Sequence, residues 1–479
     1  MACLRRVGLA LACCAAMPAA CSRNPATGQL QFGLPTDDEE VVLGREADAQ
    51  VRAAMPLYDE VPAATQVVRA VGQRVAQASE RPGLPWSFSL VDDPAVNAFA
   101  LPGGFVYVTR GLLAHLGSTD ELAAVLAHEA GHVTARHGVV QLRKQNTARR
   151  SVGLFRVIDP QLRHVGGLAA RTAGLALLRY SREDEHEADD LAVRYISAGS
   201  WDTAALVRVF AVLASLPTEG DKVPPWLSTH PDPAERRTRT AASLGISEAQ
   251  SPSAEPEYLA AIEGLAVGDD PRDGYLLDNT FVQPRRGFML QLPPKWKALH
   301  DRDQVLALSE DEQAVFVTMP TKYDSRAAAL TDFFADGTMT QGAAHDGKVG
   351  GFDVASRAFA MADEQGNTTM GLVAFIDYEG RVVAMVALGP ESTWKDRADL
   401  LAQSFASFRR IDDPKLRAVQ PLRLHTMVLA GPSTIEQLQK RPEVGVDVAT
   451  LAVLNGVDPT TPLSAGWSIK LPVVARAGG

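Results

Sequence analysis

Apolar residues in the first half of the chain recur mostly at the spacing of helices. One apolar residue every three or four positions predicts a helix with one buried face. This pattern occupies residues 37–55, 64–79, 118–138, 179–199 and 203–216. Two shorter segments, 86–93 and 105–109, alternate or are rich in β-branched residues and predict strands. We therefore expect a mainly helical first domain with a small antiparallel sheet.

The pattern changes after residue 250. Prolines and small or acidic residues fill 246–256, which predicts the end of a domain covering 22–250. From 275 to 412 apolar residues alternate in runs such as "GFMLQLP" and "AVFVTMP", and "GLVAFIDYEGRVVAMVALG" predicts a hairpin around Glu379 and Gly380. A helix, "WKDRADLLAQSFASF", follows. The fold class predicted is α+β multidomain, with an antiparallel sheet-plus-helix domain second and a small unit over 418–475 third.

Composition and charge narrow the class of protein. The 479 residues are 46% hydrophobic and carry a net charge of -10, which fits globular domains and excludes binding to nucleic acid. Residues 143–163 are locally basic. A solvated helix face is the simpler interpretation of this segment, and contact with a membrane surface is the alternative.

The first 21 residues are typical of an export signal. Arg5 and Arg6 precede a short apolar run, and all four cysteines of the chain lie here. The ending Ala-Ala-Cys resembles a bacterial lipobox, in which Cys21 would carry the lipid, although Pro18 departs from the usual aliphatic residue. We expect an exported, periplasmic lipoprotein anchored to the outer membrane; an ordinary cleaved signal is the alternative. No later apolar run is long enough to span a bilayer.

The segment "ELAAVLAHEAGHVTARHG" carries the candidate chemistry. Ser118 and Glu121 form a capping box for its helix, which Gly138 can end. His128 and His132 are four residues apart and so are offset by only about 40° around a helix, which lets both imidazoles reach one zinc ion.

Glu129 lies beside that face, where it can take a proton from water as a general base. His137 would lie about 140° away from His132 on a continuous helix, so it is interpreted as a supporting or packing residue and not as a ligand. A chance occurrence of the motif is the alternative.

Two histidines leave a catalytic zinc one protein ligand short. The stretch "EHEAD" offers Glu185 as that ligand, and Asp189, four residues on, can accept a hydrogen bond from a ligand imidazole. Other acidic residues crowd the same stretch, so an ordinary charged helix face is the alternative.

Taken in order along residues 24–245, five motifs resemble those of the HtpX/BepA-like zinc metallopeptidases, relatives of the CAAX prenyl endopeptidases. They are "NPATG", "NAFALPGGFVYVTRGLL", "HEAGHVTARHG", "SREDEHEADDLA" and "STHPDPAERR". The resemblance implies a gluzincin-type metalloendopeptidase with one zinc ion per chain.

The resemblance also implies roles for single residues. His128, His132 and Glu185 would hold the zinc, Glu129 would be the catalytic base and Asp189 would support a ligand. His230 would be a regulatory fourth ligand, with an ordinary loop histidine as the alternative, and Arg236 would support the site. An edge strand over 97–109 would bind extended substrate; its named residues are Asn97, Phe105 and Tyr107.

The chain departs from the family in two respects, since it shows neither transmembrane helices nor helical repeats. Its tail, 418–475, resembles a LysM module of βααβ type, which implies contact with peptidoglycan; a degenerate module kept for packing is the alternative. The expected function is cleavage of misfolded or mislocalised envelope proteins for quality control. The alternative is a chaperone-like or cell-wall-binding protein whose metal site His230 keeps closed.

Overall fold

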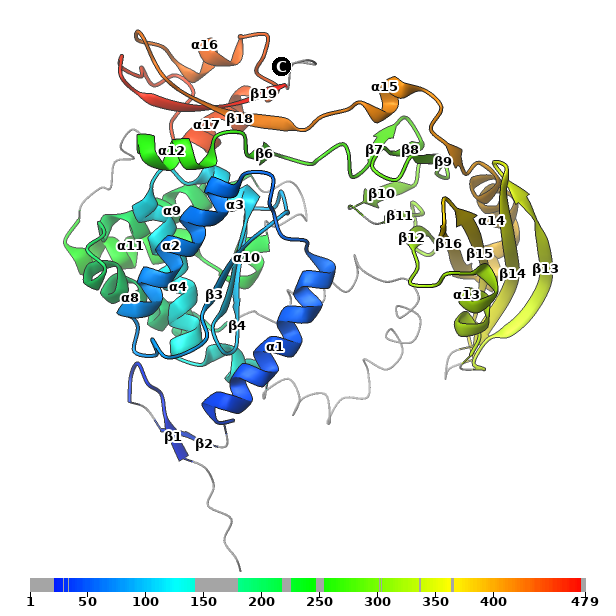
Figure 1. The fold of residues 1–479 in the computed structure, drawn as a ribbon, viewed down its shortest axis with the longest axis horizontal. Coiled ribbons are helices and arrows are strands. Elements are labelled where there is room, and N and C mark those ends of the chain that lie inside the picture. Colours follow the sequence, from blue (N-terminus) through cyan, green and yellow to red (C-terminus); the bar gives the residue numbers. More distant parts are fainter. Residues whose placement is uncertain are drawn as a thin grey trace, which may run out of the picture.

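The computed structural model describes residues 21–28, 30–32, 34–142, 180–217, 225–246, 254–300, 302, 304–335, 337–362 and 366–474. The predicted signal, apart from Cys21, and the basic segment 143–163 lie outside the described residues. The chain forms a mostly helical lobe and a mostly β lobe, with the tail lying along the helical lobe (Figure 1). Within the described ranges, no helix has the length and apolar character needed to cross a membrane.

The helical lobe contains the helices and the small sheet predicted for the first domain. Its strands are β1 (Cys21–Arg23), β2 (Leu30–Phe32), β3 (Ser87–Val91), β4 (Ala98–Leu101) and β5 (Phe105–Thr109). Its helices are α1 (Asp37–Ala54), α2 (Pro62–Ala78), α3 (Arg110–His115), α4 (Thr119–Thr134), α8 (Arg182–Ala198), α9 (Ala204–Ala214), α10 (Pro225–Thr229), α11 (Pro233–Leu244) and α12 (Pro256–Ile262).

The sheet of this lobe corrects one prediction. Its strand order is β3-β5-β4, and β3 runs parallel to β5 while β4 runs antiparallel to it. The sheet is therefore mixed, not antiparallel as expected. The chain returns from β3 through the β4–β5 hairpin, which inserts β5 between the other two strands, and alternation along a single strand carries no information about this order.

Helix α4 lies at the centre of the lobe's core. Every residue from Glu121 to Thr134 is buried, and α2, α8 and α9 pack around it. The helix ends at Thr134, four residues before the Gly138 stop that we predicted. Arg136 ends it instead by taking a left-handed conformation at φ 64°, a position that glycine usually fills.

The β lobe is built on a seven-stranded antiparallel sheet of order β10-β11-β12-β16-β15-β14-β13, as the alternation predicted. Both faces of the sheet are apolar. Helix α14 packs on one face and helix α13 on the other, and each helix belongs to a separate apolar cluster. The predicted hairpin is confirmed: Tyr378 pairs with Arg381, and Glu379 and Gly380 both have positive φ. A four-stranded sheet, β17-β9-β8-β7, completes the lobe.

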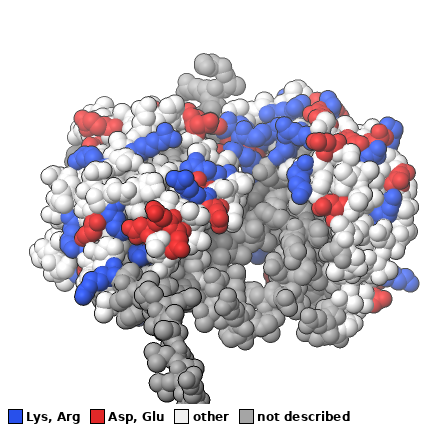
Figure 2. Space-filling view, turned by 60° about the horizontal axis from the view of Figure 1, so that its bottom comes forward, with Lys and Arg blue, Asp and Glu red and all other residues white. Residues whose placement is uncertain are grey.

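The elements of the β lobe have these bounds: β7 (Tyr275–Leu277), β8 (Thr280–Gln283), β9 (Phe288–Gln291), β10 (Lys297–His300), β11 (Val305–Leu308), β12 (Val315–Pro320), α13 (Arg326–Phe333), β13 (Thr340–Val349), β14 (Phe352–Ala362), β15 (Thr368–Tyr378), β16 (Arg381–Pro390), α14 (Glu391–Ala406) and β17 (Arg409–Arg410). Helix α15 (Pro414–Arg417) leads to the tail. On the face drawn in Figure 2, basic and acidic side chains are interspersed over both lobes.

The tail packs into the helical lobe. Its elements are β18 (Leu422–Val428), α16 (Ile435–Gln439), α17 (Val448–Asn455) and β19 (Ser468–Val474), and β18 also pairs with the linker strand β6 (Ala266–Val267). Leu424 and Leu454 join the core that contains α4. The buried Lys470 ammonium donates to the carbonyls of Ala114 and Leu116 at 2.8 Å each. The predicted order of elements is present, and the LysM resemblance stays a prediction.

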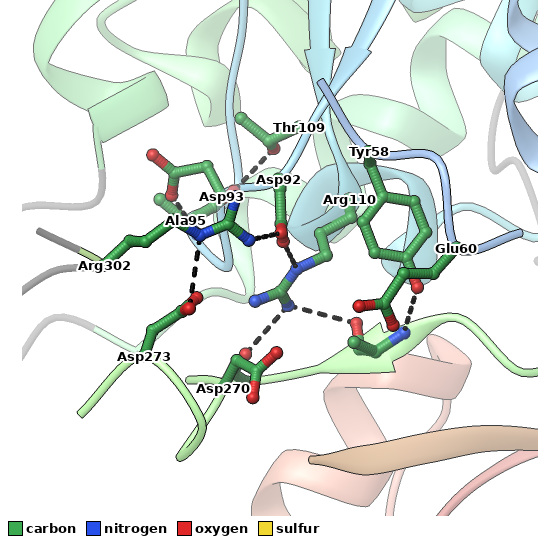
Figure 3. Close-up of polar contacts among 12 residues, drawn as sticks. Tyr58, Glu60, Asp92, Asp93, Ala95, Thr109, Arg110, Asp270, Asp273 and Arg302 are labelled. Atoms are coloured by element: carbon green, nitrogen blue, oxygen red, sulfur yellow. Dashed lines mark hydrogen bonds and ion pairs between the residues drawn. The ribbon is translucent and has the colours of Figure 1, made fainter. Parts of the chain in front are cut away.

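A cluster of charged side chains joins the two lobes. We call it the arginine junction, and it consists of Asp92, Arg110, Asp273 and Arg302 (Figure 3). Arg110 donates from Nε to Asp92 at 2.7 Å and from Nη1 to the carbonyls of Ala266 and Gly268. Arg302, from the β lobe, reaches the other oxygen of Asp92 and also Asp273. The linker and both lobes are therefore held together at one point.

Candidate metal centre

Close packing of α4 against α8 brings the two histidine- and acid-bearing helices together. Ser118 caps α4 by accepting a hydrogen bond from the Glu121 amide at 3.2 Å. Gly131 faces α8 so closely that a Cβ there would lie 3.0 Å from the Ala188 carbonyl oxygen. A side chain at 131 would therefore push α8, with Glu185 and Asp189, away from His128 and His132.

Four side chains converge on one point in the lobe. They are His128, His132, Glu185 and His230, each about 1% exposed, and one ligand atom from each lies within 4.8 Å of the others. His128 Nε2 lies 3.1 Å from His132 Nε2 and 3.3 Å from His230 Nδ1. Glu185 carboxylate oxygens lie 3.5 Å from both His128 Nε2 and His132 Nε2.

This arrangement fits a tetrahedral metal ion. With bonds of about 2.0–2.1 Å to zinc, neighbouring ligand atoms are separated by about 3.3 Å. His128 with His132 and His230, and Glu185 with all three histidines, lie at 3.0–3.5 Å, while His132 and His230 lie within 4.8 Å of each other. Three imidazole nitrogens and one carboxylate are ligands that zinc accepts. The sequence prediction placed three of these groups in the site and named His230 as a fourth; the structure brings all four together.

Glu129 lies beside the cluster with an unsatisfied carboxylate. Both of its oxygens are buried and lack a hydrogen-bond partner, and Oε1 lies 3.5 Å from His230 Nε2. Burial raises the pKa of Glu129, against the opposing effect of His230 and His128. A buried carboxylate without donors is costly, so this position suits a group that exchanges a proton with a molecule entering the site.

Asp189 and Arg236 support the cluster from behind. Asp189 Oδ1 lies 3.0 Å from His128 Nδ1, the nitrogen that faces away from the cluster. Arg236 contacts Asp189 at 2.6 Å and Glu185 at 2.7 Å, and its guanidinium lies 4.5 Å above the Phe210 ring. Burial alone would raise the pKa of Glu185, but His230 and Arg236 outweigh it and hold that pKa well below its usual value. Glu185 is therefore ionised and available to a cation.

Two aromatic residues that the sequence interpretation missed pack on the histidines. Tyr180 stacks on His132 with ring centroids 4.0 Å apart, and Trp226 stacks on His230 at 4.3 Å. Trp226 comes from the short helix α10 and precedes His230 by four residues, a spacing that places both on one side of a helical turn. That spacing in "PWLSTH" was the available signal; Tyr180 had none.

The predicted substrate strand needs a correction. Within 97–109 the edge strand is β4, whereas β5 lies between β3 and β4, so Phe105 and Tyr107 are not on an edge strand. Their side chains pack with Phe99 in an apolar cluster against α1. Asn97 is buried immediately before β4. The β-branched run over 105–109 is typical of any buried strand and does not distinguish an edge from a centre.

A small hollow of ≈ 10 Å³, enough for about one water molecule, lies between the edge strand and His132. Ala100 and Leu101 of β4 line one side, and His132 and Tyr180 line the other.

Comparisons with known proteins agree with this geometry. A model described as Peptidase family M48 matches residues 62–242. The beta-barrel assembly-enhancing protease of Yersinia pestis is 32% identical over 209 residues, which are 42% of this chain and 42% of that protein. The mitochondrial metalloendopeptidase OMA1 of Arabidopsis thaliana is 32% identical over 174 residues, 36% of this chain and 34% of that protein. The chain thus spans less than half the length of these relatives.

Solved structures add little. Cyanobacterial PsbP (CyanoP) from Synechocystis sp. PCC 6803 is similar over 28% of this chain and 95% of that chain, with a TM-score of 0.24 and 9% sequence identity. Similarity of this degree supports no conclusion about fold. The family match, in contrast, includes His128, Glu129, His132, Glu185 and His230 within its bounds. Residues 62–242 are therefore a domain of peptidase family M48, and the metallopeptidase family predicted from the sequence is confirmed for this lobe.

Proposed function

We propose that the protein is a zinc-dependent endopeptidase of the bacterial cell envelope that cleaves misfolded or mislocalised envelope proteins. The observation that carries the proposal is the convergence of His128, His132 and Glu185 beside the unpartnered carboxylate of Glu129. The M48 match over 62–242 and the similarity to a beta-barrel assembly-enhancing protease support it.

Zinc held by His128, His132 and Glu185 would supply Lewis acidity to the scissile carbonyl and to the attacking water. Glu129 takes the proton from that water and returns it to the leaving amine, as its burial and raised pKa favour. Asp189 holds the far nitrogen of His128, and Arg236 holds Asp189 and Glu185 in place.

An extended segment of the substrate would pair with β4. Among the described strands β4 pairs only with β5, so one side of it is left for a further strand. Main-chain hydrogen bonds of this kind recognise unfolded polypeptides with little regard for side chains, which suits a quality-control role.

His230 would regulate the site. Its Nδ1 lies 3.3 Å from His128 Nε2 and 3.0 Å from Glu185, so it would serve as a fourth protein ligand, whereas a catalytic zinc keeps one position free for water or substrate. Substrate access would require α10 to move, taking His230 and Trp226 away. The alternative is a chaperone-like protein in which this closed arrangement is permanent.

The deciding experiment measures casein cleavage and bound zinc for the wild type, Glu129→Gln and His230→Ala. We expect Glu129→Gln to lose activity by at least about 100-fold with zinc retained, and His230→Ala to cleave faster than the wild type. Absence of cleavage by both the wild type and His230→Ala at every zinc concentration would favour the chaperone-like alternative. Full activity in Glu129→Gln would refute its role as the base.

Location and anchoring are part of the same proposal. Cys21 would carry the lipid, and the tail would contact peptidoglycan. Labelling with a palmitate analogue in cells should modify the wild type but not Cys21→Ser, and sedimentation with purified peptidoglycan should require residues 418–475. An unlabelled wild type would leave an ordinary cleaved signal as the explanation of residues 1–21.

A further inference from the structure

His137 returns to the metal centre although it is no ligand. Its Nδ1 lies 2.9 Å from Nδ1 of His132. The contact exists because α4 ends at Thr134 and Arg136 turns the chain back with φ 64°. On a continuous helix the two imidazoles would point apart, so the early end of the helix is what brings them together.

The two nitrogens of His132 have different surroundings. Nε2 faces His128 and Glu185 in the cluster, whereas Nδ1 faces only His137. If Nε2 binds a metal, Nδ1 must carry the hydrogen, and it donates that hydrogen to Nδ1 of His137. His137 then carries its own hydrogen on Nε2.

Two carboxylates lie on the side of His137 that faces away from His132. Its Nε2 lies 3.7 Å from Glu187 and 3.6 Å from Asp184, both on α8. At these separations the two carboxylates attract a hydrogen on Nε2 of His137 by charge rather than by a hydrogen bond. The tautomer required by metal binding at His132 is therefore the one that the acidic face of α8 stabilises.

The N-terminal hairpin, β1–β2, adds a further contact to the series of residues that runs from His132 through His137 to Glu187. Asn24, 3% exposed, donates from Nδ2 to Glu187 at 2.9 Å and to the Ala135 carbonyl at 3.4 Å. Its Oδ1 accepts the amides of Ala26 and Thr27, which shapes the turn between β1 and β2. One buried side chain thus fixes the hairpin, the end of α4 and Glu187 together.

We propose that His137 and Glu187 are positioning residues that fix the tautomer and orientation of His132, and that Asn24 completes this support from the N-terminal hairpin. The inference rests on the proposed zinc site. It extends the site to the segment that directly follows Cys21, so a polypeptide section outside the M48 match contributes to metal binding.

The test compares zinc dissociation constants by competition with a chromogenic chelator, using the full chain. Loss of a partner behind a metal ligand weakens binding by about 10–100-fold, and we expect this for His137→Leu. His137→Asn places an amide oxygen near the former Nδ1 and should recover most of the affinity. Asn24→Asp keeps the acceptor that shapes the turn but loses the donor to Glu187, so it should weaken zinc binding with the turn intact.

Glu187→Gln removes the negative charge that faces His137, and it is matched by Glu183→Gln, which removes an exposed charge from the same helix. Only the first should weaken zinc binding. Equal affinity of His137→Leu and the wild type, or equal loss in His137→Leu and His137→Asn, would overturn the inference while leaving the zinc site intact. A wild type that binds no zinc would instead overturn the proposed function. Urea unfolding in excess chelator separates either result from simple misfolding.

Discussion

The metal centre and the arginine junction are both dense groups of buried charges, yet they differ in how these charges are satisfied. At the junction each oxygen of Asp92 meets a guanidinium, and Arg110 also donates to two carbonyls. At the metal centre four ligand atoms converge, and Glu129 accepts no hydrogen bond from the described residues. The protein itself completes the first cluster, and the second requires something that binds to it.

Charge density alone therefore does not identify a functional site. Buried acceptor atoms that converge without hydrogen-bond donors do identify such a site, because leaving each acceptor group unpaired costs about 1–3 kcal/mol. The predictions below test whether the two clusters differ in this way.

The largest effect should come from Arg236, a buried arginine that contacts Glu185 and Asp189 at the metal centre. Replacing it with Met leaves Glu185 and Asp189 uncompensated in the core, which should lower the free energy of unfolding by about 3–5 kcal/mol. Urea unfolding in excess chelator measures this. Arg239→Met is the control, since Arg239 forms an ion pair with the exposed Asp190 and its loss should cost less than about 1 kcal/mol. Equal losses in both would mean that burial of the pair does not matter.

The second-largest effect on stability should come from removal of the metal. Zinc at about 1,000 times its dissociation constant adds about 4 kcal/mol to the free energy of unfolding. Chelation should therefore lower the melting temperature of the wild type but leave that of His132→Ala unchanged. The junction variant Arg302→Gln should respond to chelation as the wild type does. An identical melting temperature with and without chelator would remove the difference between the two clusters.

A third test concerns Lys470. Like the arginines of the junction, this buried side chain donates its hydrogen bonds to groups of the protein itself. Burial, opposed only partly by Glu121, lowers the pKa of Lys470 to about 7 from 10.5. Between these values the unfolded chain binds the extra proton, so stability should rise with pH across that window by up to about 1.4 kcal/mol per pH unit. Lys470→Met should lose this slope, and the exposed Lys348→Met should keep it. Equal slopes in all three proteins would contradict the assignment.

The smallest effect is expected at the junction. Arg302 is partly exposed, so Arg302→Gln should cost no more than about 1 kcal/mol and should leave zinc binding unaltered. Its visible result should be looser attachment of the β lobe, measured as a larger radius of gyration by small-angle scattering. Weaker zinc binding in this variant would show that the clusters are coupled.

Much of the metal centre was predictable because the spacing of ligands along a helix is a local property. His128, His132 and the pair Glu185 and Asp189 follow from four-residue spacing, and the structure brings them together. Most helix bounds followed from apolar periodicity for the same reason. Contacts that depend on where a helix ends were not predictable: His137 meets His132 only because Arg136 breaks the helix.

The order of strands in the sheet and the contacts between residues distant in sequence could not be predicted either. Whether Phe105 and Tyr107 lie on a central or an edge strand depends on which strands pair, and alternation is the same in both cases. The arginine junction joins Asp92 to Arg302, two residues with nothing in their neighbourhoods to relate them. Docking of the tail was hidden likewise, because Lys470 looks like any strand lysine until its burial is known.

The insertion of Lys470 beneath α3 has a consequence for synthesis. Lys470 is 356 residues from Ala114, to whose carbonyl it donates, and Leu424 and Leu454 fill the same core as α4. Contacts this distant in sequence form late, because a long loop must close first. The core around the metal centre thus stays open at one side while most of the chain is still being made, and it closes only once the tail has docked.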